Sequence, residues 1–158
     1  MKINLEAISL LQDQIYDNTN KFKKLSFSPE LICKVTDSIE PSLEMHCIGF
    51  IHYIQKLLSL NSRSNKHYSE MQLVEIKSTD ENLLKYISKR RNTFYSIKNH
   101  LIANHVIYAT CSKNIFLVNP YYMSNIPYKE WKQLIYDIQV NNLREESETI
   151  SGADVYSN

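Results

Sequence analysis

Near the middle of the chain lies the stretch Arg90-Arg91-Asn92-Thr93-Phe94-Tyr95-Ser96-Ile97-Lys98-Asn99. Phe94 and Ile97, continued by Leu101, recur at steps of three and four residues, and this spacing predicts a helix over Arg91 to Asn104 with one buried stripe. The opposite face then carries hydrogen-bonding side chains. They are Asn92, Tyr95, Ser96 and Asn99, with Arg91 and Lys98 on the flanks.

A shorter helix is expected just before this one. Ser78-Thr79-Asp80-Glu81 places Ser at an N-cap and Glu three residues later, the pattern of a capping box. The helix that follows would bury Leu83, Leu84 and Ile87, and Ser88-Lys89-Arg90 would form the turn. Two helices joined by so short a turn are typical of a helix-turn-helix, although Lys89 stands where an apolar residue is common.

Two β-rich runs follow, Val106 to Thr110 and Ile115 to Asn119, separated by the turn Cys111 to Asn114. They predict a hairpin that Pro120 stops. With one strand expected over Tyr68 to Lys77, the order of elements is that of a winged helix-turn-helix. His105 stands where such domains commonly have glycine, so Asn104 is expected to supply the left-handed C-cap.

The rest of the chain is predicted to be helical. Ser28-Pro29-Glu30 resembles a helix start, and Glu40-Pro41-Ser42 ends that helix. Further helices are expected over Ile3 to Tyr16, Ser42 to Leu60 and Pro127 to Val140. The predicted fold class is therefore mainly α with a small β component. The expected divisions are an N-terminal helical segment (1–41), a winged helix-turn-helix domain (42–126), a C-terminal helix (127–143) and a disordered tail (144–158).

Charge is distributed unevenly along the chain. No Asp or Glu occurs from Asn82 to Lys129, and this stretch contains seven Lys and Arg residues, so the remainder carries −6 of a net charge of +1. A basic region in a neutral protein is expected of a surface that meets phosphate. The plainer alternative is an uneven solvated surface.

Composition excludes several classes. Hydrophobic content of 43% and charged content of 22% are typical of a soluble globular protein. No apolar run approaches the roughly 18–20 residues that span a bilayer, and the start of the chain lacks the pattern of a signal peptide. Cys33, Cys47 and Cys111 form no C-x-x-C pair, which favours free thiols and a cytoplasmic location.

These patterns together predict a sequence-specific, non-enzymatic protein that binds double-stranded DNA and needs no cofactor. Arg and Lys neutralise phosphate, Asn pairs bidentately with adenine, and hydroxyl groups bind phosphate or base edges. Lys113 lies at the expected tip of the hairpin. The predicted DNA-binding residues are Lys89, Arg90, Arg91, Asn92, Thr93, Tyr95, Ser96, Lys98, Asn99 and Lys113.

The run from Leu83 through Thr93-Phe94-Tyr95 and Val106-Ile107 to Lys113-Asn114-Ile115-Phe116-Leu117-Val118-Asn119-Pro120-Tyr121-Tyr122-Met123 resembles the RepL-type plasmid replication proteins. In that family the second wing strand leads into an Asn-Pro turn, matched here by Asn119-Pro120. The similarity covers residues 43–125. It implies recognition of a replication origin and initiation of plasmid copying, which periodicity and charge do not show.

Other functions remain open or are disfavoured. A transcriptional regulator of the same fold and a protein-interaction module without DNA affinity are the alternatives, and a homodimer or contacts with host replication or transcription proteins are further expectations. His46 and His52 lack the pairing of a nicking enzyme, and Cys47 beside His46 makes a poor metal site on a helix. Glu75-Ile76-Lys77 has the E-x-K form of a nuclease, but a solvated strand edge explains it better.

Overall fold

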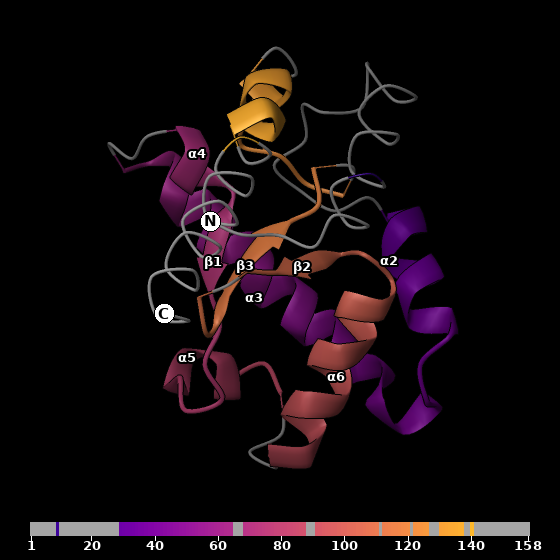
Figure 1. Cartoon of the computed structure of the whole chain (residues 1–158). Coiled ribbons are helices and arrows are strands. Elements are labelled where there is room, and N and C mark those ends of the chain that lie inside the picture. Colours follow the sequence, from indigo (N-terminus) through magenta and orange to yellow (C-terminus); the bar gives the residue numbers. More distant parts are fainter. Residues whose placement is uncertain are drawn as a thin grey trace, which may run out of the picture.

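The computed structural model of this chain describes residues 9, 29–64, 68–87, 91–110, 112–120, 122–126, 130–137 and 140. Within them the protein is mainly helical with a small β component, as predicted, and its three strands form one antiparallel sheet (Figure 1). Several predictions fall outside the described residues. They concern the helix Ile3–Tyr16 apart from residue 9, the cap Ser28, the turn Ser88–Arg90, Cys111, parts of the helix Pro127–Val140 and the tail 144–158.

Two helices before the sheet confirm the sequence prediction in type. Helix α2 spans Pro29–Asp37, and the long helix predicted from Ser42 is a 3-10 turn, η1 (Pro41–Leu43), followed by α3 (Glu44–Ser62). Pro41 favours the tight first turn because its φ is already fixed and it has no N–H to satisfy. The buried stripe of α3 forms the centre of the main core: Cys47, Phe50, Ile51, Tyr53, Ile54 and Leu58.

The prediction of one strand over Tyr68–Lys77 is wrong in its first half. The chain forms a single helical turn, α4 (Tyr68–Met71), and then strand β1 (Leu73–Glu75). Backbone pairing with the neighbouring strand extends only to Gln72, whose carbonyl oxygen accepts from Val118 N at 3.0 Å. Beyond Val118 the partner turns away at Pro120, so earlier residues would have no strand to pair with.

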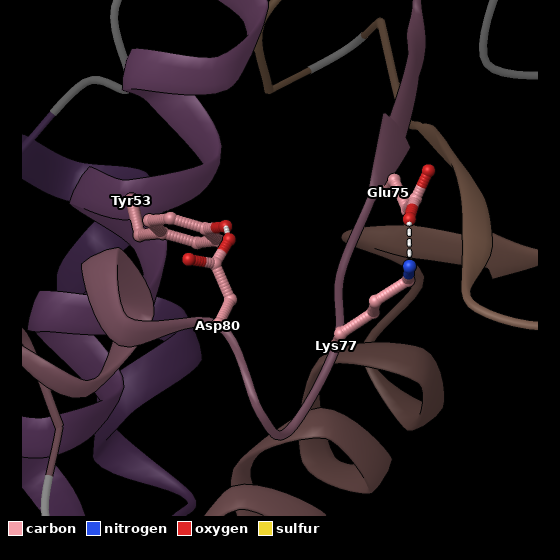
Figure 2. Close-up of polar contacts among 4 residues, drawn as sticks. All are labelled: Tyr53, Glu75, Lys77 and Asp80. Atoms are coloured by element: carbon pink, nitrogen blue, oxygen red, sulfur yellow. Dashed lines mark hydrogen bonds and ion pairs between the residues drawn. The ribbon is translucent and has the colours of Figure 1, made fainter.

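The capping box predicted at Ser78 is also wrong. Helix α5 is the short segment Glu81–Leu84, and its N-cap is Asp80, whose Oδ1 accepts from Asn82 N at 2.9 Å. The other carboxylate oxygen of Asp80 accepts from the Tyr53 hydroxyl of α3 (Figure 2). Because one side chain both caps α5 and joins it to α3, the helix begins two residues later than the capping box would place it.

The hairpin prediction is confirmed. Strands β2 (Ile107–Ala109) and β3 (Ile115–Val118) pair antiparallel, with Tyr108 opposite Leu117. Strand β1 pairs with the other edge of β3, which gives the order β1-β3-β2. The sheet buries one row of side chains in the main core with α3 and helix α6 (Arg91–Ala103). These side chains are Val74, Ile107, Phe116 and Val118.

The connection from α6 to β2 contains a left-handed residue, but it is His105 (φ 56°) and not Asn104. His105 N donates to Ile102 O at 3.1 Å and Val106 N donates to Leu101 O at 2.9 Å, the two bonds of a Schellman C-cap. Asn104 instead donates from its side chain to His100 O at 2.9 Å. The position predicted for glycine therefore has the backbone conformation that favours glycine, although a histidine occupies it.

The predicted closing helix is present over residues 130–137. Trp131 and Leu134 are buried there, and Trp131 Nε1 donates to Ser124 Oγ at 2.9 Å. Cys33 and Cys47 are free thiols, exposed and buried respectively. Among the described residues, no helix combines the length and apolar character needed to cross a membrane.

Candidate nucleic-acid interface

Helix α6 is fixed to the core along the predicted stripe. Phe94, Ile97 and Leu101 are all buried, and the Phe94 ring lies 5.8 Å from the Phe50 ring of α3, measured between centroids. The segment before α6 also packs closely against α3, since a Cβ added to Gly49 would overlap the backbone carbonyl oxygen of Tyr86. A packed inner face leaves the orientation of α6 little freedom, so its outer face is well defined.

The outer face of α6 presents the side chains expected from the sequence. Asn92, Tyr95, Ser96 and Asn99 are all exposed, and at 100° per residue they lie within about one quarter to one third of the helix circumference. Thr93 is partly buried at the side of this surface. The structure therefore brings two amides and two hydroxyls together on one convex surface, with no acidic side chain among them.

One edge of that surface is shaped by an aromatic and cationic stack. Lys98 Nζ lies 4.7 Å from the centroid of the Tyr95 ring and 5.7 Å from that of Phe94. The Phe94 and Tyr95 rings meet edge to face, 5.2 Å apart between centroids. A cation over an aromatic face is attracted by the ring quadrupole, and the Lys98 ammonium lies on the flank that carries Tyr95.

The β2–β3 turn (residues 110–114) carries the predicted cation Lys113 as an exposed side chain. Thr110 Oγ1 donates to Ile115 O at 2.8 Å and accepts from Ser112 N at 3.2 Å, while Asn114 adopts a left-handed φ of 67°. Ile76 N, just after β1, donates to Asn114 O at 2.8 Å. These bonds tie the turn to the sheet and hold Lys113 at its end.

The remaining predicted basic residues are only partly placed. Lys89 and Arg90 lie outside the described residues, and of Arg91 the structure describes the backbone, which begins α6. Lys85, at the C-cap of α5, is an exposed cation that was not among the predicted binding residues. The position of Lys85 within the acid-free stretch of the sequence was the signal that could have identified it.

The alternative chemistries find little support in the part of the chain that is described. No group of three or more His, Cys, Asp and Glu side chains there could hold a metal ion. Burial raises the pKa of the Cys47 thiol to about 11, which makes it a poor nucleophile at neutral pH. Glu75 and Lys77 form an exposed ion pair of 2.8 Å.

Comparison with protein family models, with curated proteins and with solved structures gives no match for this chain.

Proposed function

We propose that this chain is a winged helix-turn-helix protein that binds double-stranded DNA without catalysis, inserting α6 into the major groove and placing the β2–β3 turn on the adjacent backbone. The arrangement that carries the proposal is the order α3, α4, β1, α5, α6, β2, β3 together with the strand order β1-β3-β2. An exposed polar face on the second helix of the pair is where such domains read base edges.

The chemistry of α6 divides into two roles. Asn92 and Asn99 are exposed amides, each able to pair bidentately with adenine, and Ser96 between them can donate or accept at either kind of base pair. Lys98, which lies on the Tyr95 flank, and Lys113, on the β2–β3 turn, suit phosphate contacts. The separation of base-reading amides from flanking cations favours sequence-specific binding over binding by charge alone.

We further propose that the bound DNA is a replication origin, on the resemblance to RepL-type proteins. The most specific part of that resemblance, Asn119-Pro120, has a structural role in this chain. Asn119 is buried, and its Nδ2 donates to His105 O at 2.7 Å and to the Tyr108 hydroxyl at 3.3 Å. Asn119 therefore ties the end of β3 to the α6–β2 connection. Whether the protein acts in replication or in transcription depends on which DNA sequence it selects.

Salt dependence of DNA affinity tests the binding proposal. Each neutralised phosphate contributes about −0.9 to the slope of log affinity against log salt, so a steep fall is expected. Arg91→Ala should weaken binding to every sequence and flatten the slope by about 1. Arg63→Ala is the matched control, since Arg63 is an exposed residue at the C-cap of α3 and lies outside the acid-free stretch from Asn82 to Lys129. Salt-independent or undetectable binding would instead favour a protein-interaction module.

Selection of binding sites from a random pool of DNA duplexes tests the residues proposed to contact bases. Asn92→Ala and Asn99→Ala should each relax the preference at one base pair, by about 1–3 kcal/mol. A selected site that matches repeats at a plasmid origin supports initiation, whereas a site in a promoter supports regulation. If both variants select the wild-type sequence with unchanged preference, α6 is not the recognition helix.

A further inference from the structure

Glu75 and Lys77 form an exposed ion pair to which the proposed function assigns no role. Lys77 Nζ lies 2.8 Å from Glu75 Oε1, and the two side chains are 54% and 52% exposed (Figure 2). Val74 and Ile76 point into the main core, so Glu75 and Lys77 lie on the outer face of the strand. The pair is therefore a surface feature that contributes little to packing.

The sheet register places this pair beside the β2–β3 turn. Glu75 is the partner of Ile115, and the bond from Ile76 N to Asn114 O continues the ladder by one residue. Lys77 follows Ile76 in the sequence, and Lys113 precedes Asn114 in the turn. Lys77 and Lys113 therefore flank the last bond of this ladder, although 36 positions separate them in the sequence.

The same turn is the part of the sheet that the proposed function places on the DNA backbone. Residues 82–126 contain no acid, and Glu75 is the carboxylate on β1 that pairs with Ile115, the first residue of β3 after the turn. An ion pair between exposed groups is weak, because water and salt screen the attraction and both side chains lose freedom. A phosphate, which binds lysine as a strong acceptor, can displace a carboxylate from such a pair.

We propose that Lys77 is a second phosphate-binding cation of the β2–β3 turn, and that Glu75 holds it in the free protein and competes with phosphate for it. The inference rests on the proposed DNA-binding function. In the free protein the carboxylate keeps the ammonium beside β1. In the complex Lys77 and Lys113 contact the backbone together, and Glu75 lowers affinity by competing for Lys77.

Four charge-neutral amide variants test this with a mixed-sequence duplex, by fluorescence anisotropy between about 50 and 200 mM salt. Lys77→Gln should lower affinity about fivefold to tenfold near 0.1 M salt and flatten the slope by about 0.9. Glu75→Gln should raise affinity about 1.5- to 5-fold. The matched controls are Lys56→Gln on α3 and Glu40→Gln between α2 and η1, which remove the same charges from exposed positions away from the turn.

The double variant Glu75→Gln/Lys77→Gln separates competition from general repulsion. If Glu75 acts through Lys77, the double variant has the affinity of Lys77→Gln. An equal gain from Glu75→Gln in both backgrounds, or a Lys77→Gln variant that matches Lys56→Gln, overturns the inference while leaving the proposed function standing. A wild-type protein that does not bind the duplex overturns both. Thermal unfolding of each variant shows that the fold is retained.

Discussion

A single residue, His105, shows how a backbone requirement can be met by an unexpected side chain. The Schellman bonds that end α6 require a left-handed residue there, and His105 has a φ of 56°. An L-residue in this conformation crowds its Cβ against the carbonyl oxygen, which favours glycine. The His105 ring lies against Tyr108, with centroids 5.9 Å apart and planes 23° from parallel, so the side chain recovers part of that cost.

Substitution at this residue should therefore rank by backbone freedom. His105→Gly is expected to raise the free energy of unfolding by up to about 1 kcal/mol, because the gain in backbone conformation exceeds the loss of one exposed ring contact. His105→Val should lower it by about 1 kcal/mol or more, because a β-branched residue tolerates positive φ poorly. Urea unfolding monitored at Trp131 measures both, and a valine variant as stable as wild type would contradict the assigned conformation.

The residues of the candidate interface were predictable because helical spacing alone sorts α6 into two faces. Phe94, Ile97 and Leu101 had to point inward, so Asn92 and Asn99 had to point outward. The Lys98–Tyr95 stack was less accessible, since a lysine at that position could extend into solvent in several rotamers. The role proposed for Lys77 was not predicted, because Lys77 lies in a different part of the sequence and only the sheet register brings its neighbour Ile76 to the β2–β3 turn.

At the scale of elements, the start of α5 was predicted wrongly for a tertiary reason. Both Ser78 and Asp80 are good N-cap residues, and local sequence favours Ser78 because Glu81 completes a capping box. The Tyr53 hydroxyl, which comes from α3, donates to Asp80 and thereby selects the later start. A distant contact also holds Gln72, the residue before β1: its side chain donates to Val118 O at 3.1 Å and Met123 O at 2.6 Å.

The contact between α3 and α5 gives a direct prediction. Tyr53→Phe removes the donor to Asp80 but leaves the N-cap bond from Asn82 N to Asp80 in place. Hydrogen bonds to charged groups contribute about 1.5–3 kcal/mol to stability. We expect the free energy of unfolding to fall by about that amount. Tyr136→Phe is the matched control, because Tyr136 is 61% exposed and should change stability little. Equal stabilities for the two variants would mean that the Tyr53 hydroxyl does not hold α5 to α3.

For the whole molecule, the sequence predicted the fold class but not the polar contacts that hold segment 122–126 against the rest of the structure. Segment 122–126 is tied back across the domain by polar side chains: Asn125 Nδ2 donates to Leu58 O at 2.7 Å and to Met71 O at 2.9 Å. Ser124 accepts from Trp131 and so joins the helix at 130–137 to that segment. Amides and hydroxyls carry no periodic signal, so hydrophobic spacing could place the elements but not these connections between them.

The buried ionisable groups make the stability of the whole molecule depend on pH in the alkaline range. Burial raises the pKa of Cys47 from 9.0 to about 11, and it also raises the pKa values of Tyr53 and Tyr108. A group with a raised pKa in the folded state stays protonated there while the unfolded chain loses its proton. Its contribution is therefore complete below the unfolded pKa and is lost as pH rises toward the folded one.

The two described cysteines allow this dependence to be assigned. Between pH 7 and pH 10, ionisation of the unfolded Cys47 thiol should lower the free energy of unfolding by about 1–1.5 kcal/mol. Cys47→Ala removes that loss, so its stability should fall less steeply over this range even if it starts lower because of the smaller side chain. Cys33→Ala is the control, since Cys33 is exposed and its variant should keep the wild-type slope. Urea unfolding at each pH under reducing conditions measures the three slopes. A Cys47→Ala slope equal to that of wild type would show that the thiol is hydrated in the folded protein, and α3 would then be packed less tightly against the sheet and α6 than its buried stripe requires.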